Sequence, residues 1–442
     1  MTIEKRTGAA KEIEIEPLSG TLDARITAPP SKAYSLRAIF IASLAEGDSI
    51  LRNPLLADDK LVAIEALKQF GAAIERKGND LAIVGTGGCL LAPGKVDAKD
   101  SGLTVRLLCS VAAVAGKGGE KIVLDGSGRL RQRPVGDLVE GLSQIGGKIK
   151  SMNGNGCPPV EVTGKSLVGG NASINAEKSS QFISSLLIAL PLARRDSQIS
   201  ATGPLHSAPY IDITVDCMKS FGISVEKPKN GIWSVKSGQL YRGSDFQIEG
   251  DYSSAAFFFE AAAITGGKVR VGNLRRDSVQ GDGKILELLS EMGCAIHRQK
   301  NTATVEGPEE LVPVSADMGG FPDIVMPLAV ACAFAKGDSK LSNLGTLRLK
   351  ESDRVASLQD GLSRMGIQTA LEDCGNSLSI FGNPRKVKGA TVESFNDHRI
   401  AMAFAMAGLA ITGMRIKNPD CVKKSFPDFF EKTAAIGKGI DA

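Results

Sequence analysis

Cysteine, histidine and aromatic residues are scarce in this 442-residue sequence, and their scarcity excludes several kinds of site. None of the eight cysteines forms a CxxC pair and the three histidines lie far apart, so the sequence predicts no zinc or other metal site. Isolated cysteines indicate free thiols in a reducing compartment. We therefore expect a cytoplasmic protein without a resident metal.

Long apolar runs and strong charge are also missing. No run reaches membrane-spanning length without glycine or a charged residue, and the N-terminal stretch MTIEKRTGAAKEIEIEP has no apolar core typical of a signal peptide. The net charge of +4 is small, and no long basic run with interleaved aromatic residues occurs. We expect no membrane and no nucleic-acid partner, and any strong positive field must be local.

Six apolar segments repeat along the chain instead. Each begins with a capping or small polar residue, runs through about three apolar helical turns and in most cases ends at glycine. They recur roughly every 70–78 residues, and the chain is too long for one hydrophobic core. The segments begin at Ser31, Ser101, Ser179, Asp251, Phe321 and Asn396.

An amphipathic segment follows each apolar one. Its end is typically a large apolar residue, a glycine and then alternating residues, which predicts a helix that ends and feeds a strand. Runs such as KIVLDG, ATVEG and LSIFG fill the gaps as strands. Each unit is then roughly β-α-β-α-β-β, repeated six times in an α/β (α+β) fold. The glycines are Gly71, Gly146, Gly222, Gly293, Gly366 and Gly437.

Helices that are apolar on all sides should be buried, and parallel packing would gather their N-termini at one end of a domain. Such an end is an anion site, because each N-terminus carries partial positive charge and unsatisfied N–H groups. Cationic and hydroxyl side chains at these starts favour the same ligand. They include Lys32, Arg37, Arg106, Ser179, Ser180, Gln181, His398 and Arg399. We expect small, multiply charged anions to bind there.

Eight motifs make the chain resemble the 5-enolpyruvylshikimate-3-phosphate synthase family, from about residue 14 to about residue 435. In order they are PPSKAYSLRA, RQRP, SSQF, PYIDIT, GDYSSAA, LKESDR, NDHR and SFPDFF. The resemblance implies a two-domain inside-out α/β barrel in which each domain has three β-α-β-α-β-β repeats around buried parallel helices. Residues 31–248 would form the first enolpyruvyl transferase domain, and residues 1–30 plus 249–442 the second.

The resemblance also implies the reaction. The family transfers the enolpyruvyl group of phosphoenolpyruvate to the 5-hydroxyl of shikimate 3-phosphate and releases phosphate by addition–elimination, in the shikimate pathway to chorismate and the aromatic amino acids. It needs no cofactor, and a monomer is expected. The two small-molecule substrates carry two phosphates and two carboxylates, which explains the cations.

Site roles follow from the matching motifs. The residues that resemble the shikimate 3-phosphate site are Lys32, Ala33, Arg37, Ser179, Ser180, Gln181, Ser207, Tyr210, Asp323 and Lys350. Those that resemble the phosphoenolpyruvate site are Lys32, Gly102, Arg133, Gln181, Arg354, Arg399 and Lys424.

The reaction needs a base for the attacking hydroxyl and an acid for the methylene carbon. The resemblance makes Asp323 the base, Glu351 with Lys32 the proton donors, and His398 the residue that positions these groups. Cations around a buried carboxylate favour its ionised form, which suits Asp323 better than Glu351.

Four positions depart from the family's usual pattern. Ala33 stands where serine is usual, Asp100 and Leu103 replace the asparagine and threonine of a loop around Gly102, and Thr346 replaces an asparagine. Loss of the threonine hydroxyl predicts weaker phosphoenolpyruvate binding by on the order of 1 kcal/mol. These changes keep open an acceptor that is another hydroxylated ring acid.

Two further alternatives stay open. A sister transferase acts on UDP-N-acetylglucosamine, but it uses a reactive cysteine where this chain has RLRQRP. A non-catalytic anion-binding homologue would share the fold, and measurable turnover would exclude it.

Overall fold

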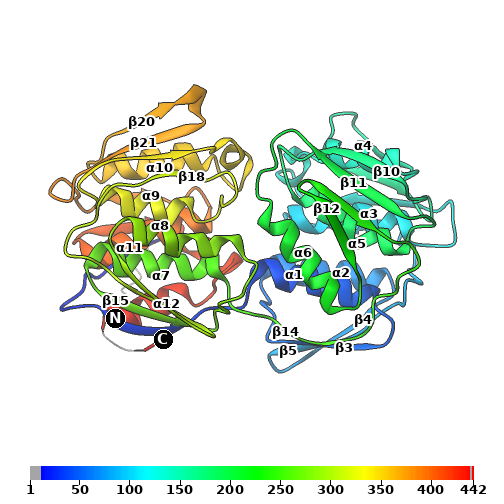
Figure 1. The fold of residues 1–442 in the computed structure, drawn as a ribbon, viewed down its shortest axis with the longest axis horizontal. Coiled ribbons are helices and arrows are strands. Elements are labelled where there is room, and N and C mark those ends of the chain that lie inside the picture. Colours follow the sequence, from blue (N-terminus) through cyan, green and yellow to red (C-terminus); the bar gives the residue numbers. More distant parts are fainter. Residues whose placement is uncertain (1–10, 439–440) are drawn as a thin grey trace. The chain divides into compact units, whose positions relative to one another are not determined.

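The computed structural model of the chain describes residues 11–438 and 441–442. These residues form two compact units, and Figure 1 shows helices enclosed by strands in each. One unit runs from Pro30 to Ile248, and the other joins Glu249–Ala442 to the N-terminal segment that ends at Pro29. Within the described part of the chain, no helix is both long and apolar enough to cross a membrane.

Three buried helices form the core of the unit Pro30–Ile248. They are α1 (Lys32–Leu44), α3 (Gly102–Val114) and α5 (Gln181–Ala189). In α1 every residue after Ala33 is buried, as its apolar sequence requires. The amphipathic helices α2 (Asp58–Gln69), α4 (Gly136–Gln144) and α6 (Pro209–Ser220) follow in alternation, and each buries only one face.

Three four-stranded mixed sheets cover these helices, and all three have the same strand order. In each, the first strand pairs parallel with the second, and the last two strands of the repeat add antiparallel. The first sheet is β14 (Asp245–Gln247), β3 (Asp48–Arg52), β5 (Asp80–Val84), β4 (Ala73–Lys77). The second is β6 (Lys95–Asp97), β7 (Lys121–Asp125), β9 (Val160–Thr163), β8 (Ile149–Ser151). The third is β10 (Asn171–Asn175), β11 (Ser197–Thr202), β13 (Ile232–Val235), β12 (Val225–Lys229).

The second unit repeats this plan. Its buried helices are α7 (Tyr252–Thr265), α9 (Val325–Ala333) and α11 (His398–Ala410), and its outer helices are α8 (Ile285–Glu291), α10 (Arg354–Arg364) and α12 (Phe429–Gly437). One sheet is β16 (Ala295–Gln299), β17 (Thr302–Glu306), β15 (Lys268–Gly272), β2 (Asp23–Thr27). Another is β18 (Ser315–Asp317), β19 (Gly337–Ser342), β21 (Ser377–Gly382), β20 (Thr369–Glu372). The third is β1 (Glu12–Ile15), β23 (Met414–Lys417), β22 (Thr391–Glu393).

Short 3₁₀ helices connect several elements. They are η1 (Leu130–Gln132), η2 (Leu190–Leu192), η3 (Gly281–Lys284), η4 (Gly345–Leu349), η5 (Asp373–Gly375) and η6 (Pro419–Lys424).

Strand exchange closes each unit. β14, at the end of the unit Pro30–Ile248, pairs parallel with β3 of the first repeat, and β2, before the first repeat, pairs parallel with β15 of the fourth. The sixth repeat departs from the common pattern, because its sheet has three strands and β1 supplies the antiparallel partner of β23. The N-terminal strands are therefore structural parts of the C-terminal unit.

The predicted helix ends are confirmed at five glycines. Gly71, Gly146, Gly222, Gly293 and Gly366 all have positive φ, between 84° and 105°. A residue with Cβ is strained in this conformation, so glycine ends the amphipathic helix and turns the chain into the next strand. Gly437 differs, because it is the last residue of α12.

Candidate active site

Buried ionic side chains gather at the helix starts of the C-terminal unit. Arg354 begins α10, and Arg399 is the second residue of α11. Asp323 lies two residues before α9 rather than on the helix itself. The chain reaches α11 through Phe395 and Asn396, which both have positive φ, and the polar residues that follow this turn are buried.

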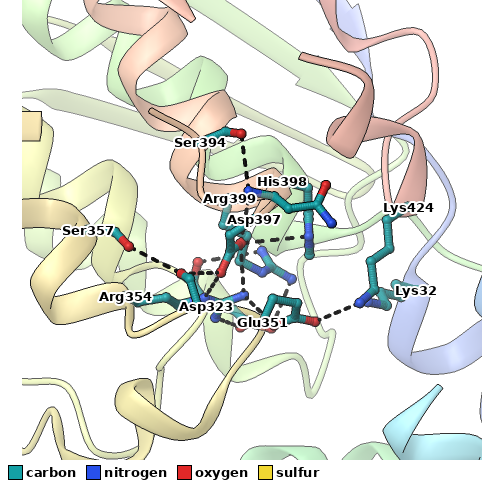
Figure 2. Close-up of polar contacts among 12 residues, drawn as sticks. Lys32, Asp323, Glu351, Arg354, Ser357, Ser394, Asp397, His398, Arg399 and Lys424 are labelled. Atoms are coloured by element: carbon teal, nitrogen blue, oxygen red, sulfur yellow. Dashed lines mark hydrogen bonds and ion pairs between the residues drawn. The ribbon is translucent and has the colours of Figure 1, made fainter. Parts of the chain in front are cut away.

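Arg354 is the centre of the cluster, and Figure 2 shows three carboxylates around it. Its Nη1 donates to Asp323 Oδ1 at 2.9 Å, its Nη2 to Glu351 Oε2 at 3.1 Å and its Nε to Asp397 Oδ2 at 2.8 Å. Arg354 is 1% exposed. Burial alone would lower the pKa of Arg354, but the carboxylates of Asp397, Glu351 and Asp323 outweigh it and raise that pKa above its usual value.

Two arginines hold the Asp323 carboxylate. Arg354 contacts Oδ1, and Arg399 Nη2 lies 2.9 Å from Oδ2. The side chain of Asp323 keeps 19% of its surface exposed, whereas those of the two arginines expose 1% and 5%. Asp323 is thus an oriented carboxylate, held from behind by charge and open to solvent on one side.

Glu351 is held in a similar way by one arginine and one lysine. Lys424, the last residue of η6, donates from Nζ to Glu351 Oε1 at 3.1 Å, while Arg354 holds Oε2. Two cations stabilise the ionised carboxylate. His398 is the first residue of α11 and is 1% exposed, with Nδ1 3.8 Å from Asp397 Oδ1. Lys350 directly follows η4 and directly precedes Glu351.

The helix starts of the unit Pro30–Ile248 carry a second set of the predicted residues. Arg106, on α3, donates from Nη1 to Gln181 Oε1 at 2.7 Å and to Ser179 Oγ at 3.4 Å, so the starts of α3 and α5 are adjacent. Its Nη2 donates to the carbonyl oxygen of Pro134 at 2.8 Å. Burial first, and nearby Arg133 second, lower the pKa of Arg106 to about 9.

Gly102, the first residue of α3, lies under the guanidinium of Arg133. A Cβ at this position would be 2.4 Å from Cζ and Nη1 of Arg133, which is far inside van der Waals contact. Glycine therefore lets the arginine lie against the start of the helix. At the start of α5, Ser179 Oγ accepts from the Gln181 backbone N–H at 3.3 Å, and Ser180 is buried.

Arg37 joins α1 to α6 and is almost fully buried. It donates to Thr214 Oγ1 at 2.6 Å, to the Ala33 carbonyl at 3.1 Å and to the Tyr210 carbonyl at 3.0 Å. Burial lowers the pKa of Arg37 to about 10. Three of the five guanidinium N–H groups of Arg37 thus have protein acceptors.

Ser207 lies two residues before α6 and has a φ of 57°, an uncommon conformation outside glycine.

Lys32 and the two loop residues that depart from the family pattern, Asp100 and Leu103, all contact other parts of the same unit. Lys32 Nζ lies 3.4 Å from Asp59 Oδ2 on α2, and its side chain is 24% exposed. Asp100 accepts a hydrogen bond from Ser127 Oγ, in the turn that leads to η1 and Arg133. Leu103 packs against the hydrophobic core of its unit. Asp100 therefore stabilises the turn before η1, which leads to Arg133.

Sequence reasoning did not assign three residues that the structure places at the centre of these groups. The sequence indicates Arg106 only as a cation at a helix start, Asp397 offers an ordinary helix cap, and nothing in the sequence singles out Ser352. The motif NDHR gave a signal for Asp397, because its neighbours carry predicted roles. In the residues that the structure describes, no group of three or more histidine, cysteine, aspartate or glutamate side chains could hold a metal ion.

The sequence and structure are similar to those of one enzyme family. The family model of EPSP synthase (3-phosphoshikimate 1-carboxyvinyltransferase) matches residues 17–433. The 3-phosphoshikimate 1-carboxyvinyltransferase of Methanoculleus marisnigri is 40% identical over 96% of this chain and 98% of its own. The chloroplastic enzyme of that name from Brassica napus is 37% identical over 97% of this chain and 86% of its own. The structure of EPSP synthase from Acinetobacter baumannii superposes with a TM-score of 0.82 at 28% identity, over 95% of this chain and 97% of that chain.

Proposed function

We propose how this chain works from one premise: it belongs to the EPSP synthase family. The chain is a 3-phosphoshikimate 1-carboxyvinyltransferase. It transfers the enolpyruvyl group of phosphoenolpyruvate to the 5-hydroxyl of shikimate 3-phosphate, releases phosphate and so serves the shikimate pathway. The roles of individual residues, the domains, the compartment and the assembly state are the proposal.

The reaction is an addition followed by an elimination. The 5-hydroxyl oxygen attacks C2 of phosphoenolpyruvate while its own proton leaves to a base and the methylene carbon takes a proton from an acid. Loss of phosphate from the tetrahedral intermediate, with return of one methyl proton to the protein, restores the carbon–carbon double bond. Chain residues must therefore supply a base, an acid and cations for two anionic substrates.

Asp323 is the proposed base, and its position carries the proposal. Arg354 and Arg399 each hold one oxygen at 2.9 Å, which keeps the carboxylate ionised and fixes its direction. One side of Asp323 stays open to solvent, where a substrate hydroxyl can approach. Glu351 and Lys32 are the proposed proton donors, and His398 positions them. Because Lys424 and Arg354 favour the charged form of Glu351, Lys32 is the better acid while these contacts persist.

Substrate binding is assigned to two overlapping sets of residues, which include some of the catalytic groups. For shikimate 3-phosphate we propose Lys32, Ala33, Arg37, Ser179, Ser180, Gln181, Ser207, Tyr210, Asp323 and Lys350. For phosphoenolpyruvate we propose Lys32, Gly102, Arg133, Gln181, Arg354, Arg399 and Lys424. The serines lie at or next to helix starts, where backbone N–H groups favour phosphate.

The acceptor is tested by phosphate release with three acceptors at equal concentration. We expect release with shikimate 3-phosphate, and far less with shikimate, which lacks the phosphate that the serines would hold, or with UDP-N-acetylglucosamine. Faster release with either of the other two acceptors than with shikimate 3-phosphate would contradict the assignment and give Ala33 and Leu103 a role in specificity.

Gly102→Ala is expected to weaken phosphoenolpyruvate binding. The new Cβ would displace the guanidinium of Arg133, so roughly one charge-assisted hydrogen bond is lost and the KM for phosphoenolpyruvate rises by about tenfold to a hundredfold. Steady-state kinetics with each substrate varied measure this. Gly94→Ala is the matched control, since a Cβ there meets nothing within 4 Å. An unchanged KM in the Gly102 variant would remove Arg133 from the site.

We also propose that the two compact units are the two enolpyruvyl transferase domains, and that the chain is a cytoplasmic monomer without nucleic-acid partners. All eight cysteines are free, which suits a reducing compartment. Each unit encloses its own hydrophobic core. The net charge of +4 is small for a nucleic-acid-binding protein.

A further inference from the structure

Asp397 lies behind the proposed catalytic groups of the C-terminal unit. Its side chain is 0% exposed, whereas those of Asp323, Glu351 and Lys424 expose 19%, 16% and 23%. A substrate that enters from solvent meets these three side chains but not Asp397. Any effect of Asp397 on the reaction must therefore pass through the residues that it contacts.

The main contact of Asp397 is the inner edge of the Arg354 guanidinium. Nε donates to Oδ2 at 2.8 Å, and Nη2 lies 3.4 Å from Oδ1, so two oxygens of one carboxylate hold one edge of the planar group. The opposite side, Nη1, points to Asp323. A ligand carboxylate or phosphate that competes for Nη1 would leave the Asp397 edge in place.

The same carboxylate also fixes the second arginine. Asp397 Oδ1 accepts the backbone N–H of Arg399 at 3.0 Å and so caps α11. The Arg399 side chain then reaches Asp323 Oδ2 at 2.9 Å. The Asp397 carboxylate thus contacts both arginines that hold the proposed base, Arg354 through its side chain and Arg399 through its backbone N–H.

Two buried hydroxyl groups, one of which contacts Asp397 directly, join this carboxylate to α10. Ser352 Oγ donates to Asp397 Oδ2 at 3.2 Å, and Ser357 Oγ lies 3.3 Å from Ser352 Oγ. Ser352 and Ser357 are 9% and 3% exposed. Ser352 directly follows Glu351, and Ser357 is on the first turn of α10, so the hydroxyls connect the carboxylate to the helix that carries Arg354.

We propose that Asp397 is a positioning residue for phosphoenolpyruvate binding: it orients Arg354 and Arg399 toward the substrate anion, and Ser352 keeps it in place. The inference rests on the proposed function of these arginines. Removing the negative charge of Asp397 frees the inner edge of Arg354 to rotate and leaves a buried arginine with less compensation. Binding of the anion that Arg354 receives should weaken first.

Asp397→Asn tests this with little change in shape, because the amide oxygen still caps α11. We expect the KM for phosphoenolpyruvate to rise by about tenfold or more, and the KM for shikimate 3-phosphate to change by less than about threefold. Ser352→Ala should shift the phosphoenolpyruvate KM in the same direction by about two- to fivefold. If Asp397→Asn does not fold, the serine variant alone decides, and an unchanged KM in it counts against the proposal.

Asp353→Asn is the matched control. Asp353 directly precedes Arg354 and caps α10 through the Ala356 N–H at 3.1 Å, and its carboxylate pairs with Arg348. In the described structure the Asp353 carboxylate makes no hydrogen bond or ion pair to the Arg354 side chain, and asparagine caps a helix as well as aspartate does. Its kinetics should stay close to wild type. Equal rises of both KM values in Asp397→Asn would indicate a purely structural role and overturn the inference. Absence of turnover in the wild-type protein would instead overturn the proposed function.

Discussion

Replacing Asp323 with asparagine is expected to lower the turnover of shikimate 3-phosphate and phosphoenolpyruvate by between about a hundredfold and about ten-thousandfold, the usual contribution of a general base. The amide has nearly the shape of the carboxylate but cannot take the proton of the attacking hydroxyl. Asparagine also turns one N–H₂ group toward either Arg354 or Arg399, which now hold the two carboxylate oxygens at 2.9 Å. Phosphate release under saturating substrates measures the effect on kcat.

The control is Asp317→Asn, at the end of β18. Asp317 is exposed and accepts from the Gly319 N–H and from Asn343, away from the cluster around Arg354. We expect its turnover to match wild type. If Asp323→Asn keeps a kcat within about threefold of wild type while the protein is folded, Asp323 is not the base.

Replacing Glu260 with methionine is expected to stabilise the protein by on the order of 1 to 3 kcal/mol, the usual cost of burying a polar group without a hydrogen-bond partner. Glu260 lies in the middle of the buried helix α7 and is 0% exposed, and neither of its carboxyl oxygens has a hydrogen-bond partner in the described structure. Burial raises the pKa of Glu260 well above its usual value. The folded chain therefore holds this carboxyl protonated in an apolar core.

Glu260 should make the free energy of unfolding decrease as the pH rises. Above the ordinary glutamate pKa the unfolded chain releases this proton while the folded chain keeps it, so the unfolded state binds fewer protons. The contribution of Glu260 is most favourable below that pH, and stability falls by about 1.4 kcal/mol per pH unit as the pH rises toward the raised pKa of the folded state. Methionine removes both this slope and the burial of an unpartnered polar group.

Urea denaturation at a series of pH values from acidic to mildly alkaline measures both effects. Glu260→Gln should lose the pH slope but keep part of the polar burial cost, so it should lie between wild type and the methionine variant. Glu431→Gln, at an exposed position of α12, is the control and should leave the slope unchanged. A Glu260→Gln variant that keeps the wild-type slope would contradict the account of a buried, protonated carboxyl.

Much of the fold could be predicted from the sequence because its signals are local. The apolar segments became buried helices, and Gly71, Gly146, Gly222 and Gly293 end helices with positive φ. Strand exchange was harder to predict in detail, because the pairing of β14 with β3 joins residues about 195 positions apart and has no local pattern. The three-stranded sixth sheet was hard to predict for the same reason, since the antiparallel partner of β23 is β1, from the opposite end of the chain.

The candidate site shows the same division. The motifs LKESDR and NDHR identified Glu351, Arg354 and Arg399, and the family resemblance added Asp323. The structure brings all four into one cluster. The local sequence could not show that Asp397, which resembles an ordinary helix cap, also holds Arg354 from 43 positions away. Nor could it show that the partners of Arg37 lie on α6 as well as on its own helix. Such partners depend on how helices from different repeats pack.

The most direct test of the account follows both products of the reaction. Purified protein is given shikimate 3-phosphate and phosphoenolpyruvate, and phosphate is measured together with the mass of the organic product. The account predicts equimolar phosphate and a product whose mass equals that of both substrates less phosphoric acid. A folded protein that binds phosphoenolpyruvate but leaves shikimate 3-phosphate unchanged would contradict it.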